Sequence, residues 1–375
     1  MPWNERGKMT IKKEFLDKAL NKDLSISRLC KEYGISRKTA YKWIKRFNEE
    51  GLSGLEEHSR RPCRVRVTAS DWVEKVLNTR NQFPAWGARK LRQYLVNQGY
   101  KDIPSESTFN RTLQRHGLID KIASEKREHY IRFERENPNE LWQMDFKGHF
   151  QLEEGRCHPL TVLDDHSRYS ICLKACESED VISVRSALTE AFRTYGLPEA
   201  MTMDNGSPWK GSYPWRFSQL TIWLMRLGIK VSHSTPGHPQ TQGKDERFHR
   251  SLKDEVLRYY QFKDLRDTQK RFDEWRNLYN NERPHEGIGL KRPIDRFRPS
   301  KTKFPEILTE IAYEEGDEIR KVQKNGIIEY RGNPIFIGEH LHGERVAVRS
   351  TSKDGIFDVY YSKTRLNKLD LTTQK

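Results

Sequence analysis

The sequence LWQMDF, residues 141–146, places an acidic residue, Asp145, inside an apolar run. Such a run of aromatic and aliphatic side chains predicts a buried β-strand. A second run, AMTMD at residues 200–204, predicts another strand, which ends in Asp204 directly before an Asn-Gly turn. A third carboxylate, Glu246, lies at the start of a strongly helical segment. Because a strand, a strand end and a helix start can face one point, we predict that the three carboxylates form one site.

The helical segment that begins near Glu246 has two contrasting faces. Arg250 and Lys253 share the face of Glu246, whereas Phe248 and Leu252 lie on the opposite face. Magnesium ions are held by a few carboxylates together with phosphate oxygens of the substrate, and two such ions can clamp both reacting oxygens of a phosphodiester. The site is therefore predicted to hold metal. Beside the site, Lys244, Arg247, Arg250 and Lys253 are predicted to hold a phosphate backbone, and a charge run that is only solvated is the alternative.

Four motifs follow one another in this part of the chain: WQMD at 142–145, VLDDHSR at 162–168, DNG at 204–206 and PGHPQTQGKDER at 236–247. In this order they resemble the transposases of bacterial insertion sequences of the Asp-Asp-Glu type. The catalytic core of that family is similar to that of retroviral integrases, within the ribonuclease-H-like superfamily. One departure is that 41 residues separate Asp204 from Glu246, more than is usual there. We attribute the excess to a loop insertion at residues 207–215, which are rich in Gly, Pro and Trp.

The resemblance implies a DNA transposase, a Mg²⁺-dependent polynucleotidyl transferase that binds terminal inverted repeats and catalyses strand cleavage and strand transfer. Asp145, Asp204 and Glu246 would be the catalytic residues and would hold two Mg²⁺, for which Mn²⁺ can substitute. The partners would be double-stranded DNA, as repeats and as target, and further copies of the chain in a dimer or larger homo-oligomer. Two alternatives are a non-catalytic helix-turn-helix DNA-binding regulator with a retired core and a structure-selective nuclease of the same fold.

Basic residues are concentrated at the front of the chain. Of the 375 residues, 68 are Lys or Arg and 53 are Asp or Glu, which gives a net charge of +15. Residues 1–135 contain 30 of the basic and 17 of the acidic side chains, so the remainder is close to neutral. The front of the chain is therefore predicted to bind a polyanion, with an affinity that falls steeply as salt rises. A basic surface that is only solvated is the alternative.

The composition also indicates the compartment. The five cysteines show no Cys-x-x-Cys spacing, which indicates neither a zinc site nor a disulfide framework. No signal peptide is visible, and the longest apolar run, around residues 220–225, is too short to span a bilayer. We expect a cytoplasmic, nucleoid-associated protein with no membrane partner.

Residues 1–58 are predicted to form a helix-turn-helix DNA-binding domain. The apolar spacing indicates helices at residues 15–20, 27–33 and 37–48, with a tight turn at Gly34. The third helix would meet the major groove of DNA. Its outward residues, for which DNA contact is favoured over a solvated face, are Lys38, Tyr41, Lys42 and Lys45.

A basic linker, residues 59–67, follows, and its Arg60 and Arg61 are predicted to lie in a minor groove or, alternatively, in solvent. Residues 68–118 predict a second, winged helix-turn-helix domain. Its expected helices are residues 71–82, 88–96 and 105–116. The residues of the last helix predicted to bind DNA are Arg111, Gln114 and Arg115. Two such modules suit a long terminal repeat, and a packing role for the second is the alternative.

Residues 119–139 predict a linker, and residues 140–299 the ribonuclease-H-like integrase catalytic core. In residues 300–375 the pattern changes to short alternating strands. The predicted strands are residues 327–330, 335–337, 345–348 and 356–361. They suggest a small β-barrel similar to the SH3-like C-terminal domain of integrases. The predicted fold class is thus multidomain α+β: two helical modules, an α/β core and a β-barrel.

Several polar residues near the predicted site have a structural explanation. Asp164 and Asp165 precede a turn between strands, which favours turn capping over metal ligation. Asp245 would point about 100° away from Glu246 around the helix, which favours exposure to solvent. The nearby histidines lack the paired spacing of a zinc set and are predicted to contact DNA or cap the loop; they are His233, His238 and His249.

Overall fold

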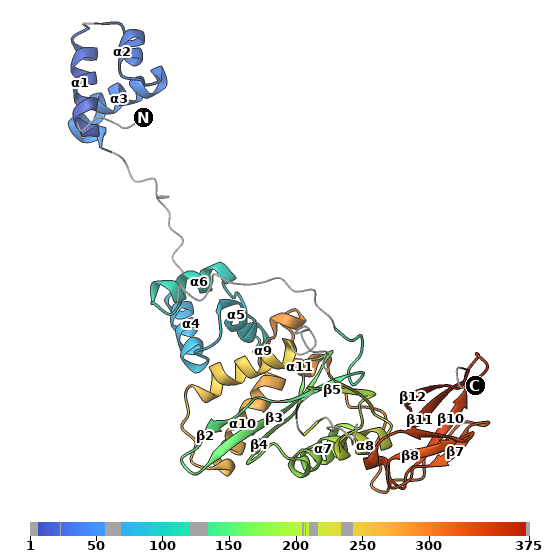
Figure 1. Cartoon of the computed structure of the whole chain (residues 1–375). Helices are drawn as coiled ribbons and strands as arrows, with labels where there is room; N and C mark the ends of the chain where they lie inside the picture. Colours follow the sequence, from blue (N-terminus) through green and yellow to red (C-terminus); the bar gives the residue numbers. More distant parts are fainter. Residues whose placement is uncertain are drawn as a thin grey trace. The chain divides into compact units, whose positions relative to one another are not determined.

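The structure is a computed structural model that describes residues 7–22, 24–56, 69–119, 134–204, 206, 208–209, 217–233 and 243–372. Met1–Val67 and Thr68–Lys375 form two compact units, of which the first is drawn in blue in Figure 1. No helix within these described residues is long and apolar enough to cross a membrane. The predicted basic linker, with Arg60 and Arg61, lies outside them.

The first unit contains the predicted helix-turn-helix. Its helices are α1 (Lys8–Leu20), α2 (Ile26–Glu32), α3 (Arg37–Glu50) and the short 3-10 helix η1 (Gly51–Leu55). Phe15 and Ala40 are fully buried where the helices meet. Gly34 adopts a φ of 63°, which only glycine reaches without strain, and so turns the chain between α2 and α3. The Ser36 side chain then caps α3 by accepting a hydrogen bond from the backbone N–H of Thr39.

A second three-helix module begins the larger unit. It consists of α4 (Ser70–Gln82), α5 (Ala88–Asn97) and α6 (Glu106–Arg115). Leu91 and Phe109 are fully buried between these helices. The described residues 69–119 contain the three helices and no strand, and the predicted wing of this domain stays a prediction. Gly117, with a φ of 68°, ends the last helix.

A mixed sheet forms the centre of the larger unit. Its strands are β1 (Trp142–Phe146), β2 (Phe150–Gln151), β3 (Arg156–Asp164), β4 (Ser170–Cys176), β5 (Ala200–Met203) and β6 (Lys230–His233). The order is β2-β3-β1-β5-β6, with β4 on β3. β1 runs antiparallel to β3 and parallel to β5. This mixture of hairpin and crossover connections is the predicted ribonuclease-H-like arrangement.

Helices cover both faces of this sheet. α7 (Val181–Tyr195) and α8 (Gln219–Arg226) lie on one face, and α9 (Gly243–Leu252), the π-helical turn η4 (Lys253–Leu257) and α10 (Leu265–Asn281) on the other (Figure 1). Side chains alternate along β1, so Trp142 and Met144 enter the core with α7 and α8. The intervening residues point towards α9. The short helices η5 (Glu286–Ile288) and α11 (Pro293–Arg296) follow α10.

The C-terminal strands form two sheets and no closed barrel. The strands are β7 (Glu318–Lys321), β8 (Ile327–Tyr330), β9 (Asn333–Phe336), β10 (Arg345–Ser350), β11 (Ile356–Tyr361) and β12 (Thr364–Asp370), with the 3-10 helix η6 (Glu339–Leu341) before β10. One sheet has the order β12-β11-β10-β7, and β8 pairs with β9 alone. Within residues 317–372, therefore, the predicted SH3-like barrel is not confirmed. The physical reason is that Ile328 and Tyr330 of the hairpin pack onto the larger sheet through side chains.

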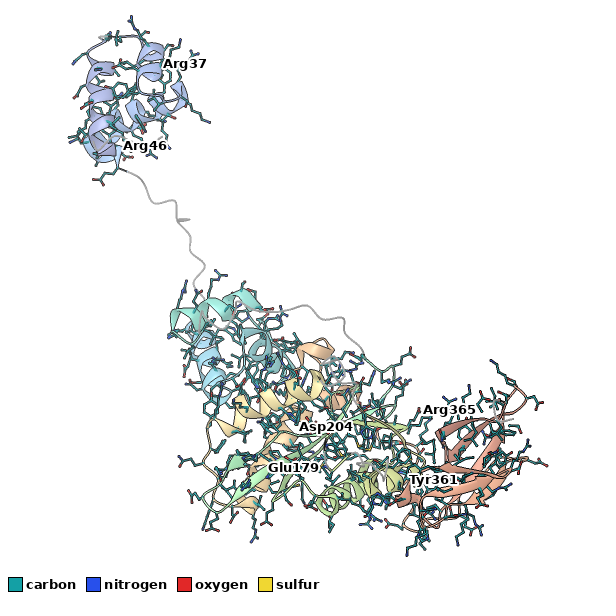
Figure 2. The ribbon with its side chains drawn as sticks, in the orientation of Figure 1. Arg37, Arg46, Glu179, Asp204, Tyr361 and Arg365 are labelled. Carbon is teal, nitrogen blue, oxygen red and sulfur yellow. The ribbon has the colours of Figure 1, made fainter. Side chains whose placement is uncertain are left out.

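The C-terminal sheets are attached to α8. Ile222 and Met225 on α8 belong to the same hydrophobic cluster as Val346 and Val359 of the larger sheet. Arg226 pairs with Glu344 at 2.6 Å beside them. Figure 2 labels Tyr361 and Arg365 on these C-terminal strands and Arg37 and Arg46 on the first unit.

The N-terminus of α7 provides a test of one local interaction. Asp180 accepts hydrogen bonds from Ser183 N at 2.8 Å and from the hydroxyls of Ser183 and Ser178 at 2.7 Å. These bonds lower the pKa of Asp180 to about 2. We predict that Asp180→Ala reduces the free energy of unfolding by about 1 kcal/mol at neutral pH. Urea unfolding of the full chain, followed by tryptophan fluorescence, measures this.

The pH dependence of this cap has a defined sign. Because the pKa in the folded state lies below the value of about 3.9 in an unfolded chain, the charged cap stabilises above pH ~4 and loses its effect as pH falls towards 2. The control is Asp180→Asn, which keeps an acceptor for the helix but cannot titrate. The stability advantage of wild type over Asp180→Asn should shrink between pH 5 and pH 2; an advantage that stays constant would contradict the prediction.

Candidate active site

Two of the predicted carboxylates lie on neighbouring parallel strands. The register pairs Gln143 of β1 with Thr202 of β5, and two residues further along both strands lie Asp145 and Asp204. The side chain of Asp145 is 23% exposed. Asp204 follows β5 directly, and its carboxylate accepts a hydrogen bond from Gly206 N at 2.9 Å (Figure 2). The parallel pairing thus brings both carboxylates to the same edge of the sheet.

The third carboxylate, Glu246, lies in the first turn of α9 and is exposed. Phe248 and Leu252 are buried on the opposite face of α9, as predicted, and hold the helix against the sheet. The Glu246 carboxylate therefore lies on the face of α9 opposite to the one that Phe248 and Leu252 pack against the sheet.

His249, one turn after Glu246, connects α9 to β1 and β3. Its Nε2 lies 2.9 Å from Thr161 Oγ1, and that hydroxyl donates to the backbone oxygen of Asp145. His249 Nδ1 lies 4.0 Å from Asp145 Oδ2. Burial lowers the pKa of His249 to about 4, so the ring is neutral near pH 7. The sequence predicted that His249 contacts DNA or caps the loop, and the contact with Thr161 adds a structural role that this prediction did not include.

Negative charge accumulates around Asp145. Burial raises the pKa of Asp145 to about 7, and the charges of Asp204, Glu179 and Glu246 add to the effect. Carboxylates this close raise one another's pKa because their negative charges repel, and a bound divalent cation would offset that repulsion. The donor set consists of carboxylate oxygens, which fits Mg²⁺ or Mn²⁺. Among the described residues, however, no three His, Cys, Asp or Glu side chains approach closely enough to hold an ion. The three-ligand set therefore stays a prediction.

The structural explanation proposed for Asp164 is confirmed. Its carboxylate is fully buried and accepts hydrogen bonds from Asn139 N at 2.7 Å and from Ser167 N at 2.8 Å. The Ser167 hydroxyl donates to the same oxygen. Asp164 thus caps the turn between β3 and β4 and holds the chain that enters β1.

The prediction that Asp245 is exposed is wrong. Asp245 is 1% exposed, and its Oδ1 has no hydrogen-bond partner among the described residues. Burial and the charge of Asp145 raise its pKa well above the ordinary value. The physical reason is helical periodicity, because Asp245 precedes Phe248 by three residues and Leu252 by seven and so shares their buried face.

The predicted DNA-binding cations divide into two groups. Arg247 and Arg250 on α9 and Lys253 at the start of η4 are exposed. Lys244 differs: its side chain is 13% exposed and forms an ion pair with the fully buried Asp165. On the helical modules the predicted contacts are all exposed: Lys38, Tyr41, Lys42 and Lys45 on α3, and Arg111, Gln114 and Arg115 on α6. His238 lies outside the described residues, and His233 Nδ1 lies 2.8 Å from the backbone oxygen of Asp204.

The chain matches families of DNA-acting proteins along most of its length. Residues 135–239 match the family described as Integrase core domain, and residues 227–293 match a second family of the same description. Residues 11–62 match a Helix-turn-helix domain and residues 39–113 a Homeodomain-like domain. Residues 317–375 match the IS481 family transposase, C-terminal domain.

Individual relatives come from bacterial insertion sequences. Over 156 residues the chain is 29% identical to the Insertion element IS476 uncharacterized 39.2 kDa protein of Xanthomonas euvesicatoria, which covers 42% of this chain and 43% of that protein. The Insertion element IS407 uncharacterized 31.7 kDa protein of Burkholderia multivorans is 27% identical over 42% of this chain and 55% of its own length. The Transposase for insertion sequence element IS904 of Lactococcus lactis is 24% identical over 63% of this chain and 97% of its own length.

These matches confirm the resemblance stated from the four sequence motifs. The chain spans about half the length of the two insertion-element proteins, 43% and 55%.

The two explanations of Asp164, turn cap and metal ligand, predict different results for Asp164→Ala. Loss of the carboxylate leaves two buried N–H groups, of Asn139 and Ser167, without an acceptor. We predict a loss of about 2 to 4 kcal/mol in the free energy of unfolding, since each such group costs about 1 to 3 kcal/mol. Urea unfolding measures the loss, with the exposed Glu190→Ala as control. Wild-type stability combined with lost Mn²⁺ binding would instead make Asp164 a ligand.

Proposed function

From the premise that this chain carries the integrase core and the C-terminal domain of insertion-sequence transposases, we propose that it is a DNA transposase. It binds the terminal inverted repeats of its element and catalyses metal-dependent strand cleavage and strand transfer. The observation that supports the proposal is the register of the parallel β1–β5 pair, in which Asp145 on β1 and Asp204 directly after β5 lie at matching positions, with α9 held near Asp145 through His249 and Thr161.

In this proposal Asp145, Asp204 and Glu246 hold two divalent cations, Mg²⁺ or Mn²⁺. The cations would supply activation of the attacking oxygen and charge stabilisation of the leaving oxygen in both the cleavage and the joining step. The role of the chain is to fix the geometry. β1 and β5 set the position of the two aspartates, and α9 would carry Glu246 towards them. Thr161 and His249 limit the movement of α9 relative to Asp145.

The exposed cations of the chain bind DNA in this proposal. Arg247, Arg250 and Lys253 follow Glu246 on exposed positions of α9 and η4, where they would hold the phosphates of the DNA end. The exposed faces of α3 and α6 bind the repeat. Since two ends of an element must be cut and joined together, the active form is a dimer or a larger homo-oligomer.

The catalytic role is tested with Asp204→Asn. The purified full chain is incubated with labelled DNA that carries the ends of its element, a target plasmid and Mg²⁺ or Mn²⁺. Wild type should cleave the ends and join them to the target. Asp204→Asn should reduce both products by at least about 100-fold, because it removes a metal ligand, while repeat binding is unchanged. Glu190→Gln, an exposed change on α7, is the control and should behave like wild type.

Two other outcomes would replace the proposal. Wild-type protein that binds the repeat but neither cleaves nor joins it would be a DNA-binding regulator. Wild-type protein that cleaves branched or hybrid duplexes without any joining would be a structure-selective nuclease.

The role of α3 is tested by the salt dependence of repeat binding. Lys38 and Lys42 are exposed on this helix. If both contact phosphates, the double variant Lys38→Ala/Lys42→Ala should bind more weakly, and the slope of log affinity against log salt should fall by about two. Fluorescence anisotropy with a labelled repeat measures the slope. Lys31→Ala on α2, exposed but away from the predicted reading face, should leave the slope unchanged.

A further inference from the structure

Asp165 connects the strand that carries Asp145 to the helix that carries Glu246. It is fully buried after β3. Its Oδ1 accepts a hydrogen bond from Gln143 Nε2 at 2.9 Å and forms the ion pair with the Lys244 ammonium. Gln143 lies two residues before Asp145 on β1, and Lys244 lies two residues before Glu246 on α9. One carboxylate oxygen therefore joins the two elements.

We propose that Asp165 and Lys244 are positioning residues that set the distance between Asp145 and Glu246 and thereby the metal affinity of the site. The inference rests on the proposed function, because it assumes that these two carboxylates hold the same pair of cations. Neither positioning residue touches metal or DNA in this role. In this proposal Lys244 supports the site and does not contact DNA, unlike the role predicted for it from the sequence.

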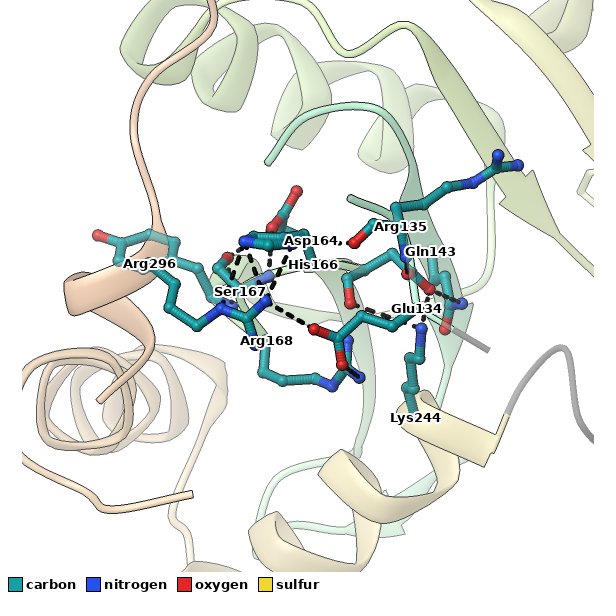
Figure 3. A network of polar contacts seen from close by, with 11 residues as sticks. Glu134, Arg135, Gln143, Asp164, His166, Ser167, Arg168, Lys244 and Arg296 are labelled. Atoms are coloured by element: carbon teal, nitrogen blue, oxygen red, sulfur yellow. Dashed lines mark hydrogen bonds and ion pairs between the residues drawn. The ribbon is translucent and has the colours of Figure 1, made fainter. Parts of the chain in front are cut away.

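Asp165 is suited to this role because its own position is held from several sides. Its backbone N–H donates to Leu141 O at 2.9 Å, and its second carboxylate oxygen accepts from Arg135 N at 2.8 Å. Asp165 therefore cannot follow α9 if the helix moves. Figure 3 shows Lys244 extending from the start of α9 towards Gln143 on the strand.

Lys244 holds the first turn of α9, before Glu246. Phe248, His249 and Leu252 all follow Glu246 and anchor the later turns of the helix. Lys244 anchors the start, so that Glu246 lies between two fixed points. Because Glu246 is itself exposed, its position depends on the helix backbone rather than on packing of its side chain.

The test measures metal binding directly. Full-length wild type and variants are titrated with Mn²⁺ without DNA, and electron paramagnetic resonance reports free ion. Lys244→Met, which keeps the length of the side chain and removes its charge, should weaken Mn²⁺ binding by about 10- to 100-fold, the usual effect of losing an outer-shell support of a metal site. Lys244→Arg should restore much of the affinity. Lys270→Met, an exposed change on α10, should match wild type.

The Mg²⁺ concentration that gives half-maximal cleavage of element ends should rise with Lys244→Met by a similar factor, and high Mg²⁺ should recover much of the rate. A purely structural loss would lower the rate at every metal concentration instead. If circular dichroism shows that Lys244→Met is unfolded, Lys244→Gln takes its place, since the amide can still donate to Asp165.

Asp204→Asn separates this inference from the proposed function. Lost Mn²⁺ binding in Asp204→Asn, together with wild-type binding in a folded Lys244→Met, would overturn the positioning role and leave the function standing. If Mn²⁺ binds Asp204→Asn as tightly as wild type, the proposed metal site is contradicted and both proposals fall. The same conclusion follows if Mn²⁺ binds neither protein. Weaker binding in both variants, with Lys244→Arg close to wild type, supports both.

Discussion

The parallel pairing of β1 with β5 is the constraint on which the candidate site depends. In a strand, successive side chains point to opposite faces, so a shift of one residue in this register would turn Asp145 into the apolar core and expose Met144 to α9. The register is held because Trp142, Met144 and Phe146 fill the core beneath α7 and α8. The same burial that defines β1 as a central strand therefore orients its one acidic residue. The position of Asp145 follows from apolar packing on the other face of the sheet.

Much of the fold was predictable because its elements carry strong local patterns. The helices of both N-terminal modules and the strands β1 and β5 carry apolar patterns, and the structure has them close to the predicted positions, except that α1 begins at Lys8 and not at residue 15. β7, with the sequence EIRK, was missed because its single apolar residue gives no alternation. The barrel was predicted from strands that do exist, but strand pattern does not determine pairing. Side chains of the β8–β9 hairpin pack on the larger sheet, and this contact is invisible to local sequence.

The candidate site was only partly predictable, for a different reason. The identities of Asp145, Asp204 and Glu246 stand out because each carboxylate lies in an unusual local setting. Their supports do not, since Lys244 and Asp165 are 79 residues apart and Thr161 and His249 are 88 apart. A lysine in a charged helix looks like a solvated or DNA-binding cation until its partner is known. Asp245 shows the opposite limit. It lies three residues before Phe248 and seven before Leu252, a spacing that indicated burial, but the prediction considered only its angle from Glu246.

Burial of acidic groups near Asp145 also affects the stability of the whole core. Asp145 and Asp245 both lose hydration on folding, and the negative groups around them oppose ionisation, which disfavours the folded chain at neutral pH. A cation that binds only the folded state offsets this effect by mass action, in proportion to the logarithm of its concentration over its dissociation constant. When no cation is bound, the apolar layers on both faces of the sheet keep the carboxylates in place. In the proposed function, hydrophobic packing supplies the stability and the carboxylates at the edge of the sheet bind the cations. The ion pair between Lys244 and Asp165 belongs to both parts. It is a buried contact, and its proposed effect is on the positions of the carboxylates at the edge of the sheet.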